Sequence, residues 1–167
     1  MSSSEPCEVQ ITGYFPGVIG MITELHATYY YENWGFDLTF ETQVGRELSE
    51  FMTDFQDGRD GLWVATVNGE FAGSIAIDGR QSMKEGARLR WFIVHPQFQC
   101  KGIGGSLINQ ATDFCRKEGH SKVFLWTFEG LDAARSLYER WGFRLLEEHE
   151  VYQWGQNINE QMFELNL

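Results

Sequence analysis

The stretch that decides the fold runs from residue 90 to residue 107 and reads Arg90-Trp91-Phe92-Ile93-Val94-His95-Pro96-Gln97-Phe98-Gln99-Cys100-Lys101-Gly102-Ile103-Gly104-Gly105-Ser106-Leu107. An apolar strand, Ala87–Val94, leads into a loop with three glycines, and an amphipathic helix, Ile103–Lys117, follows at once. Amides at a helix N-terminus lack partners within the helix and sit at the positive end of its dipole, so anions bind there. Glycines let a phosphate approach the main chain without meeting a Cβ. The stretch therefore predicts a phosphate-binding loop.

Two other kinds of phosphate loop do not fit these residues. A Walker loop needs a lysine after its last glycine, whereas Lys101 comes before Gly102. A dinucleotide-binding loop needs a third glycine at position 107, which is Leu107. A purely structural interpretation stays open, in which the glycines only permit a tight turn from strand to helix.

The rest of the chain alternates between helix and strand patterns on both sides of this loop. Asn68-Gly69 tolerates the positive φ angles of a tight hairpin turn, and apolar residues three and four apart mark helix faces. The expected elements are a strand at Val9–Tyr14, a helix at Gly17–Tyr31, a helix face at Phe40, Val44, Leu48, Phe51 and Phe55, strands at Leu62–Val67, Phe71–Asp78 and Ala87–Val94, a helix at Ile103–Lys117, a strand at Lys122–Thr127, a helix at Leu131–Trp141, and strands at Arg144–Trp154 and Gln161–Leu167. This order predicts an α/β protein with a mixed sheet.

Length and composition favour one globular domain over residues 1–167. Hydrophobic residues make up 43% of the chain, enough for a real core, and no apolar run approaches the roughly 18 residues of a membrane span. The first residues have neither the basic nor the apolar character of a signal peptide. The three cysteines (Cys7, Cys100 and Cys115) are too few and too scattered for a disulfide framework or a zinc site. We expect a cytoplasmic protein without a metal.

The net charge of −11 is unevenly distributed along the chain. Residues 1–60 carry a net −9, residues 80–144 a net +5 and residues 146–167 a net −5. A chain this acidic is a poor partner for nucleic acid, because affinity for duplex DNA depends on neutralising phosphates. The positive middle segment can hold a small polyanion, although segment charges also scatter by chance. The two acidic segments, residues 1–60 and 146–167, favour a substrate that is neutral or cationic at pH 7.

Two motifs resemble the GNAT superfamily of acyl-CoA N-acyltransferases. Gln99-x-x-Gly102-x-Gly104 is similar to that superfamily's pyrophosphate loop, and the run from Ala133 to Phe143, with Tyr138 and Gly142-Phe143, resembles its last helix. The sequences of Leu125-Trp126-Thr127 and Gln161–Leu165 are similar to those of acetyltransferase halves that follow winged-helix regulators in bacterial proteins. No DNA-binding half is expected within these residues. The resemblance covers about residues 8–167. It implies the GNAT fold, an α/β (α+β) architecture with a mixed central sheet of about seven strands and four helices on its faces.

The resemblance implies acetyl-CoA as a co-substrate and assigns the residues that bind it. The strands Ala87–Val94 and Lys122–Thr127 would splay apart to admit the pantetheine, beside Phe92, Ile93 and Val94. The pyrophosphate contacts would come from Gln99, Cys100, Lys101, Gly102, Ile103, Gly104, Gly105 and Ser106. Lys101 can equally be a solvated loop lysine. One departure concerns Phe128, because the family often has a polar residue there, commonly Asn, that contacts the pantetheine.

The resemblance also assigns Tyr138 as the catalytic acid that protonates the leaving thiolate, with a core tyrosine as the alternative interpretation. The general base is not decided by the sequence. His26 is one candidate, and its position also fits a histidine that only packs at the edge of the core. Glu32 and Glu129 are weaker candidates. The acceptor pocket is expected between the first two helices and the last strand pair. The aromatic residues available to line it, unless they serve packing alone, are Tyr29, Tyr30, Tyr31, Trp34 and Trp154.

The function predicted on this basis is transfer of an acetyl group from acetyl-CoA to a primary amine of a small molecule or peptide, by direct attack in a ternary complex. The alternative is a GNAT-fold acyl-CoA sensor or interaction module with little turnover. A third hypothesis is a nucleotide-binding regulator that uses the glycine loop. The expected partners are acyl-CoA and a neutral or cationic amine, with no nucleic acid and no membrane, and a homodimer stays open.

Overall fold

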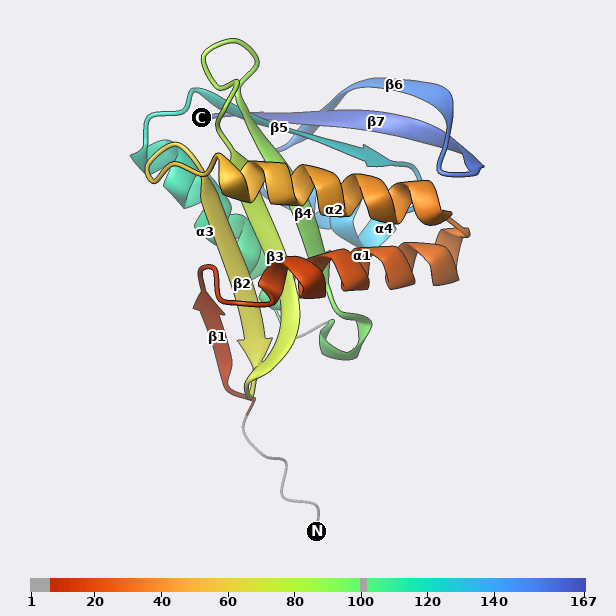
Figure 1. Ribbon diagram of the computed structural model, residues 1–167. Helices are drawn as coiled ribbons and strands as arrows, with labels where there is room; N and C mark the ends of the chain where they lie inside the picture. The colour runs from red at the N-terminus through yellow and green to blue at the C-terminus, as the bar shows by residue number, and fades with distance from the viewer. Residues whose placement is uncertain (1–6, 100–101) are drawn as a thin grey trace.

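A mixed sheet of seven strands organises the computed structural model, which describes residues 7–99 and 102–167 (Figure 1). Its strand order is β1-β2-β3-β4-β5-β7-β6, and within the described residues β4 with β5 is the parallel pair. The elements in chain order are β1 (Val9–Thr12), α1 (Val18–Trp34), α2 (Leu38–Thr53), β2 (Gly61–Val67), β3 (Glu70–Asp78), β4 (Ala87–Val94), the 3-10 turn η1 (Pro96–Phe98), α3 (Ile103–Lys117), β5 (Lys122–Phe128), α4 (Asp132–Arg140), β6 (Arg144–Gln153) and β7 (Gln156–Asn166). The predicted mixed sheet with four α-helices is confirmed for this part of the chain.

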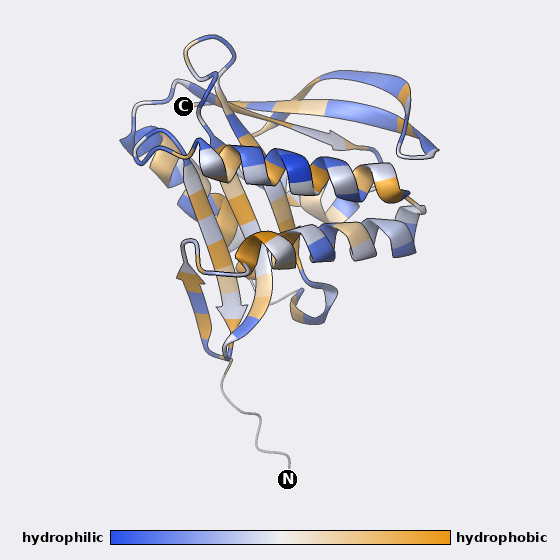
Figure 2. Cartoon of the chain, viewed as in Figure 1, coloured by the Kyte–Doolittle hydropathy of each residue, from blue (hydrophilic) through white to orange (hydrophobic). Residues whose placement is uncertain are grey.

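Helices cover both faces of the sheet, so its central strands are buried on both sides. In β3, Ile75 and Ile77 belong to the core beneath α3, whereas Ala76 between them belongs to the core beneath α1 and α2. This alternation follows from the two-residue period of a strand. Figure 1 shows α1 and α2 in front of the sheet and α3 behind it, and Figure 2 shows hydrophobic residues concentrated along the central strands. The two layers produce one core on each face.

Helix α2 forms as its sequence pattern predicts. Phe40, Val44, Leu48 and Phe51 lie on its buried face, and the Asp37 carboxylate caps its first turn by accepting the Thr39 amide at 2.9 Å. The predicted face also included Phe55, which lies beyond the end of the helix and packs edge-on against Phe51 instead.

Several boundaries differ from those predicted. Helix α1 continues past Tyr31 to Trp34, where Gly35 ends it with a φ of 72°. The last strand begins at Gln156 rather than Gln161, directly after a turn in which Trp154 and Gly155 both have positive φ angles. The early part of β7 is polar and half-exposed, so it lacks the apolar alternation that identifies a strand.

A bulge in β4 and the divergence of β4 from β5 shape the centre of the molecule. Ser74 pairs with Ile93 and Ala76 with Arg90, which leaves β4 with an extra residue at Trp91, whose φ is 48°. The buried Ser74 hydroxyl fixes the bulge by donating to the Trp91 carbonyl at 2.7 Å. On its other side β4 meets β5 at only two described register pairs, Ala87 with Val123 and Arg88 with Phe124. Beyond them the two strands separate, as predicted (Figure 1).

Candidate active site

The divergence of β4 and β5 opens a cavity of about 970 Å³. Residues of α1, α2, α3, α4, β4 and β5 line it, together with the turn between β6 and β7. The cavity has a glycine-rich end at the start of α3, a middle section between the two separated strands, and an aromatic end below α1 and α2. It is large enough for two small reactants.

The glycine-rich end brings together most of the residues assigned to the predicted phosphate loop. Gln99, Gly102, Ile103, Gly104 and Gly105 line the cavity with Val94 of β4. Gly102 caps α3 in the left-handed conformation, with a φ of 76° and no side chain satisfying the helix amides. The first amides of the helix therefore face the cavity end without partners in the helix. Cys100 and Lys101 lie outside the described residues.

The glycines of α3 also have a packing role. A Cβ on Gly104 would come within 3.0 Å of Leu137 Cδ1, and a Cβ on Gly105 would come within 3.0 Å of a ring carbon of Trp141. Both neighbours belong to α4 or to its end, so the close approach of α3 and α4 needs small residues here. The structural and the phosphate-binding interpretations of the glycines are therefore compatible.

Two residues at this end differ from the sequence-based assignment. Ser106 does not line the cavity, and its amide donates to the Gly102 carbonyl at 3.1 Å, which leaves it unavailable to a ligand. Arg140 of α4, which the sequence reasoning missed, lines the cavity with an exposed guanidinium. No local motif marks it, because only the contact between α3 and α4 brings it to the glycines.

Tyr138 lies in the middle section. Its ring packs against Phe92, Phe143 and Phe163 at centroid distances of 5.9 to 6.1 Å, so the side chain is buried and also lines the cavity. Within the described residues its hydroxyl has no hydrogen-bond partner. Burial, with a smaller contribution from Tyr30, raises the pKa of Tyr138. The phenol therefore keeps its proton at neutral pH and can donate it.

The aromatic end contains the three predicted acceptor-pocket residues His26, Tyr30 and Trp34, all of which line the cavity. Tyr30 is half-buried, stacks on Phe36 and meets Phe128 edge-on. Tyr29 and Trp154 line the cavity as expected. Tyr31 does not: it is 67% exposed, because it lies on the outer face of α1.

His26 is a neutral hydrogen-bonding group rather than a strong base. Its Nδ1 lies 2.7 Å from the Ile22 carbonyl, which can only accept, so Nδ1 carries the proton and Nε2 has a free lone pair. Burial lowers the pKa of His26 to about 4, with the bond to Ile22 opposing the shift. Glu32 and Glu129, the weaker candidates, are not among the residues lining this cavity.

Phe128 belongs to the aromatic cluster rather than to a polar contact. It is buried and packs against Tyr30, Trp34 and Phe36 at 5.3 to 5.8 Å. An amide contact to a pantetheine therefore cannot come from this side chain.

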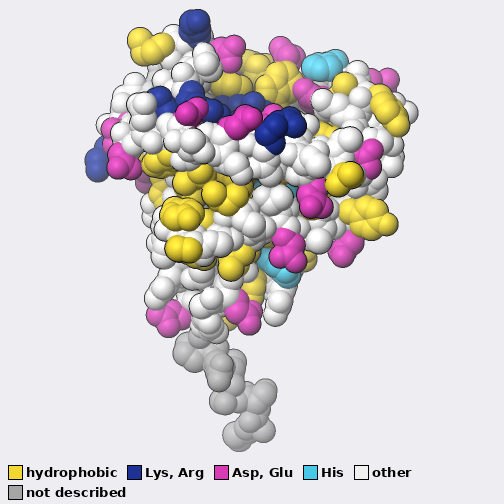
Figure 3. All heavy atoms as spheres, in the orientation of Figure 1, with side chains coloured by type: hydrophobic (Ala, Val, Ile, Leu, Met, Phe, Trp, Pro, Cys, Tyr) yellow, Lys and Arg dark blue, Asp and Glu magenta, His cyan; other side chains and the backbone are white. Residues whose placement is uncertain are grey.

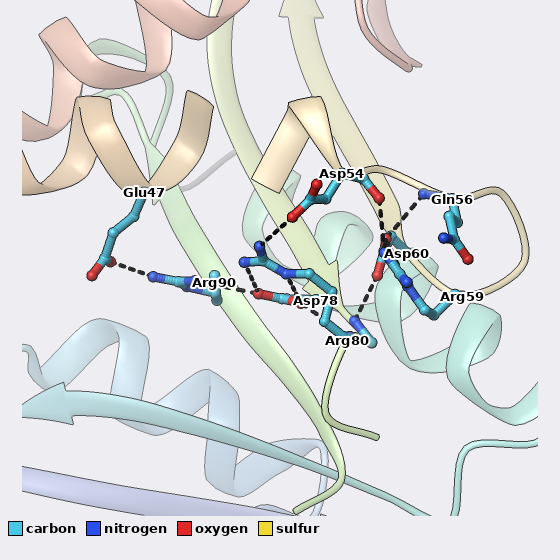
Figure 4. Close-up of polar contacts among 9 residues, drawn as sticks. Glu47, Asp54, Gln56, Arg59, Asp60, Asp78, Arg80 and Arg90 are labelled. Carbon is cyan, nitrogen blue, oxygen red and sulfur yellow. Dashed lines mark hydrogen bonds and ion pairs between the residues drawn. The ribbon is translucent and has the colours of Figure 1, made fainter. Parts of the chain in front are cut away.

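Two arginines of β4 line the cavity, and only one is ion-paired. Arg90 pairs with Glu47 of α2 and lies 3.3 Å from Asp78 (Figure 4). Burial alone would raise the pKa of Asp78, but bonds from Arg80 and the charge of Arg90 hold it below its usual value. Figure 3 shows such basic and acidic side chains interleaved on this face near α2. Arg88 makes no ion pair within the described residues.

In the part of the chain that the structure describes, no helix is long and apolar enough to cross a membrane. Among residues 7–99 and 102–167, no group of three or more His, Cys, Asp or Glu side chains could hold a metal ion.

The fold of acyl-CoA-dependent acyltransferases combines the features seen here, namely two separated parallel strands, a glycine-capped helix and a buried tyrosine. The chain belongs to the acetyltransferase (GNAT) family, whose sequence profile matches residues 19–143. An uncharacterized N-acetyltransferase of Methanocaldococcus jannaschii is 36% identical over 96 residues, 55% of this chain and 41% of that protein. N-acetylaspartate synthetase of Danio rerio is 34% identical over 91 residues, 54% of this chain and 32% of that protein. The chain thus spans less than half the length of these relatives.

Solved structures share the fold over nearly the whole chain. An acetyltransferase of the GNAT family from Staphylococcus aureus superposes with a TM-score of 0.77 at 14% identity, covering 95% of this chain and 99% of that one. A putative acetyltransferase from Salmonella typhimurium, solved with its cofactor acetyl-CoA, gives a TM-score of 0.76 at 16% identity, covering 95% and 93%.

Proposed function

We propose that this protein transfers the acetyl group of acetyl-CoA to a primary amine by direct attack in a ternary complex. The observation that carries the proposal is the continuity of one cavity from the glycine-capped start of α3, past Tyr138, to His26 and Tyr30. A cofactor and an acceptor can therefore meet without leaving the protein. Holding two reactants in line is worth roughly 7–11 kcal/mol of the barrier.

The glycine-rich end fits the pyrophosphate of coenzyme A. Gly102 leaves the backbone open, since a Cβ there would meet nothing within 4 Å, and the first amides of α3 lack partners in the helix. The proposed contacts are those of Gln99 to Gly105, with Arg140 adding a cation from α4. The separated edges of β4 and β5 offer backbone groups to the pantetheine as an added strand would.

Tyr138 has the properties that the leaving group requires. In the proposed transfer the amine nitrogen bonds to the thioester carbon, the carbon–sulfur bond breaks, and coenzyme A leaves as its thiol. Tyr138 donates the proton to sulfur, and the tyrosinate regains one from solvent. The phenol is protonated at neutral pH, and burial raises its pKa further, so it gives up its proton only as negative charge develops on sulfur. We assign stabilisation of the developing oxyanion to backbone amides at the bulge of β4.

The amine must lose a proton, and no strong base lies at the aromatic end. Deprotonating an alkylamine of pKa about 10.4 at pH 7 costs about 4.6 kcal/mol. We infer that Nε2 of His26 accepts a hydrogen bond from the amine and orients it, while water takes the proton. A histidine of pKa about 4 suits this role, since it stays neutral over the working pH range.

The acceptor is proposed to be neutral or cationic at pH 7, since the acidic segments 1–60 and 146–167 contribute α1, α2, β6 and β7 around its pocket. We further propose a cytoplasmic enzyme, with residues 1–167 acting as one acetyltransferase domain. The similarity to acetyltransferase halves of winged-helix fusion proteins and a homodimer both stay predictions.

Thiol release measured with acetyl-CoA across a panel of primary amines tests the function. We expect release that depends on the amine and saturates in both substrates. Tight binding of acetyl-CoA without release for any amine would instead support the acyl-CoA sensor. Tighter binding of ATP or NAD than of coenzyme A would support a nucleotide-binding regulator.

A further inference from the structure

Two buried polar atoms of residues that line the cavity have no hydrogen-bond partner in the part of the chain that the structure describes. They are Nε of Arg88 and Oε1 of Gln153. Both residues line the cavity, Arg88 from β4 and Gln153 from the end of β6. Buried polar groups are nearly always hydrogen-bonded, and an unsatisfied one costs about 1–3 kcal/mol, more when it is charged. An unpaired donor and an unpaired acceptor in one cavity therefore indicate a ligand.

Two of the three carboxylates near Arg88 are paired elsewhere. Glu47 and Asp78 both pair with Arg90, whereas Glu160 lies 3.8 Å from His149 Nε2, a contact that is an ion pair only when the histidine is protonated. Burial and the nearby Arg90 lower the pKa of Arg88 to about 10, while Glu47, Asp78 and Glu160 oppose the shift. The guanidinium is still charged at pH 7. Arg88 is therefore a cation facing a cavity without a bound anion of its own.

The position of Arg88 excludes the pyrophosphate as its partner. It precedes Val94, at the glycine-rich end, by six residues of the same strand, a span of about 20 Å. The carboxylates near it are instead Glu47 of α2, Asp78 of β3 and Glu160 of β7, none of which lies at the glycine-rich end. The anion that Arg88 binds therefore belongs to the acceptor.

A carboxylate matches the unsatisfied donor of Arg88. A guanidinium forms its strongest hydrogen bonds with a carboxylate. The aromatic end of the cavity has Tyr30, Trp34 and Trp154 available to an apolar side chain. An amino acid with such a side chain is a zwitterion with no net charge, in keeping with the acidic surroundings.

We propose that the acceptor is a free amino acid with an apolar side chain, whose carboxylate binds Arg88. This assignment rests on the proposed amine transfer and narrows it. An internal lysine or an N-terminal residue of a peptide lacks a carboxylate beside its amine, so neither provides an anion for Arg88.

Matched acceptors test the assignment. We would measure kcat/KM for L-phenylalanine and L-leucine, for their primary amides, and for 2-phenylethylamine. The amides have less basic nitrogens, so chemistry alone favours them. We expect the wild type to prefer each amino acid over its amide by tenfold or more. Arg88→Gln should reduce that preference below threefold, mainly through the KM for the amino acid.

Further variants separate recognition from folding. Arg88→Lys keeps the positive charge but not the planar guanidinium that can bind both carboxylate oxygens. We therefore expect part of the preference for amino acids over their amides to return. Arg116→Gln, an exposed arginine of α3, should leave the preference unchanged. Amides or 2-phenylethylamine used as well as the amino acids, with no effect of Arg88→Gln or Arg88→Lys, would overturn the assignment and leave the acetyltransferase proposal intact.

A binding measurement keeps the two proposals distinguishable. Calorimetric titration of L-phenylalanine into the protein saturated with coenzyme A should give a Kd that rises at least tenfold in Arg88→Gln. Binding that depends on Arg88 without any turnover would uphold the carboxylate site and contradict the proposed function. Equal binding to wild type and Arg88→Gln would overturn the carboxylate site.

Discussion

Arg88 lies opposite Phe124 in the second of the two described register pairs that join β4 to β5, and beyond this pair the parallel strands separate. The same strand then carries Trp91 in a bulge and Phe92 to Val94 along the cavity. One strand thus connects the proposed carboxylate contact with the proposed pantetheine edge. The proposed reaction centre lies between them, next to Tyr138.

Replacing Tyr138 by Phe tests the proposed acid. The hydroxyl has no partner within the described residues, so its loss should change the free energy of unfolding by less than about 1 kcal/mol. The lost interaction exists mainly in the transition state, so kcat should fall more than KM rises, by about 10²–10⁴-fold. Steady-state kinetics and thermal unfolding on one preparation give both numbers. A folded variant with kcat within threefold of wild type would refute the assignment.

Replacing Gly104 by Val tests the glycine-rich end. A branched side chain there would keep a phosphate off the helix amides and would press on Leu137, which lies 3.0 Å from an ideal Cβ. We expect coenzyme A to bind at least tenfold more weakly, and the melting temperature to fall. Gly20→Ala in α1 is the matched control, because a Cβ there meets nothing within 4 Å. Normal coenzyme A affinity in a folded Gly104 variant would show that the loop is misassigned.

Replacing Arg140 by Gln tests the cation that α4 adds to the glycine-rich end of the cavity. Its guanidinium is exposed, so folding should be unaffected. We expect the Kd for coenzyme A to rise severalfold at low salt and the difference from wild type to shrink as salt screens the charge. Arg144→Gln in β6 removes an exposed charge that does not line the cavity. Equal effects of the two substitutions would mean that Arg140 acts only through net charge.

Buried His26 predicts a pH dependence of stability. Its pKa is lowered from 6.5 to about 4, so between these values the unfolded chain binds a proton that the folded chain does not. The free energy of unfolding should therefore fall as the pH drops from 6.5 to 4, by roughly 3 kcal/mol from this group. Urea unfolding of wild type and His26→Gln across this range measures the difference. Parallel pH profiles of the two proteins would contradict a buried neutral histidine.

Local patterns made the glycine loop and most of the elements predictable. The apolar spacing from Phe40 to Phe51 specifies α2, and the residues from Gln99 to Gly105 specify a capped helix after a strand. The bulge was not predictable, because Trp91 has a positive φ that tertiary contacts such as the Ser74 hydrogen bond impose.

The charges of the site depend on contacts between distant segments. Arg88 and Arg90 have equivalent places in the strand pattern, and the packing of α2 pairs Glu47 with Arg90, whereas Arg88 has no ion pair among the described residues. Arg140 likewise reaches the cavity only through the contact of α4 with α3. A sequence pattern reports which face of a strand or helix a residue occupies, but not which charge arrives from another element.

The most direct test of acetyl transfer is a product balance in a single reaction. The protein is mixed with acetyl-CoA and L-phenylalanine, and free thiol and N-acetylated amine are quantified together, the latter by mass spectrometry. We predict one acetylated amine for each thiol released, with both lost in parallel in Tyr138→Phe. Thiol release without acetylated amine, or bound acetyl-CoA that persists unchanged with this and every other amine, would contradict an amine acetyltransferase.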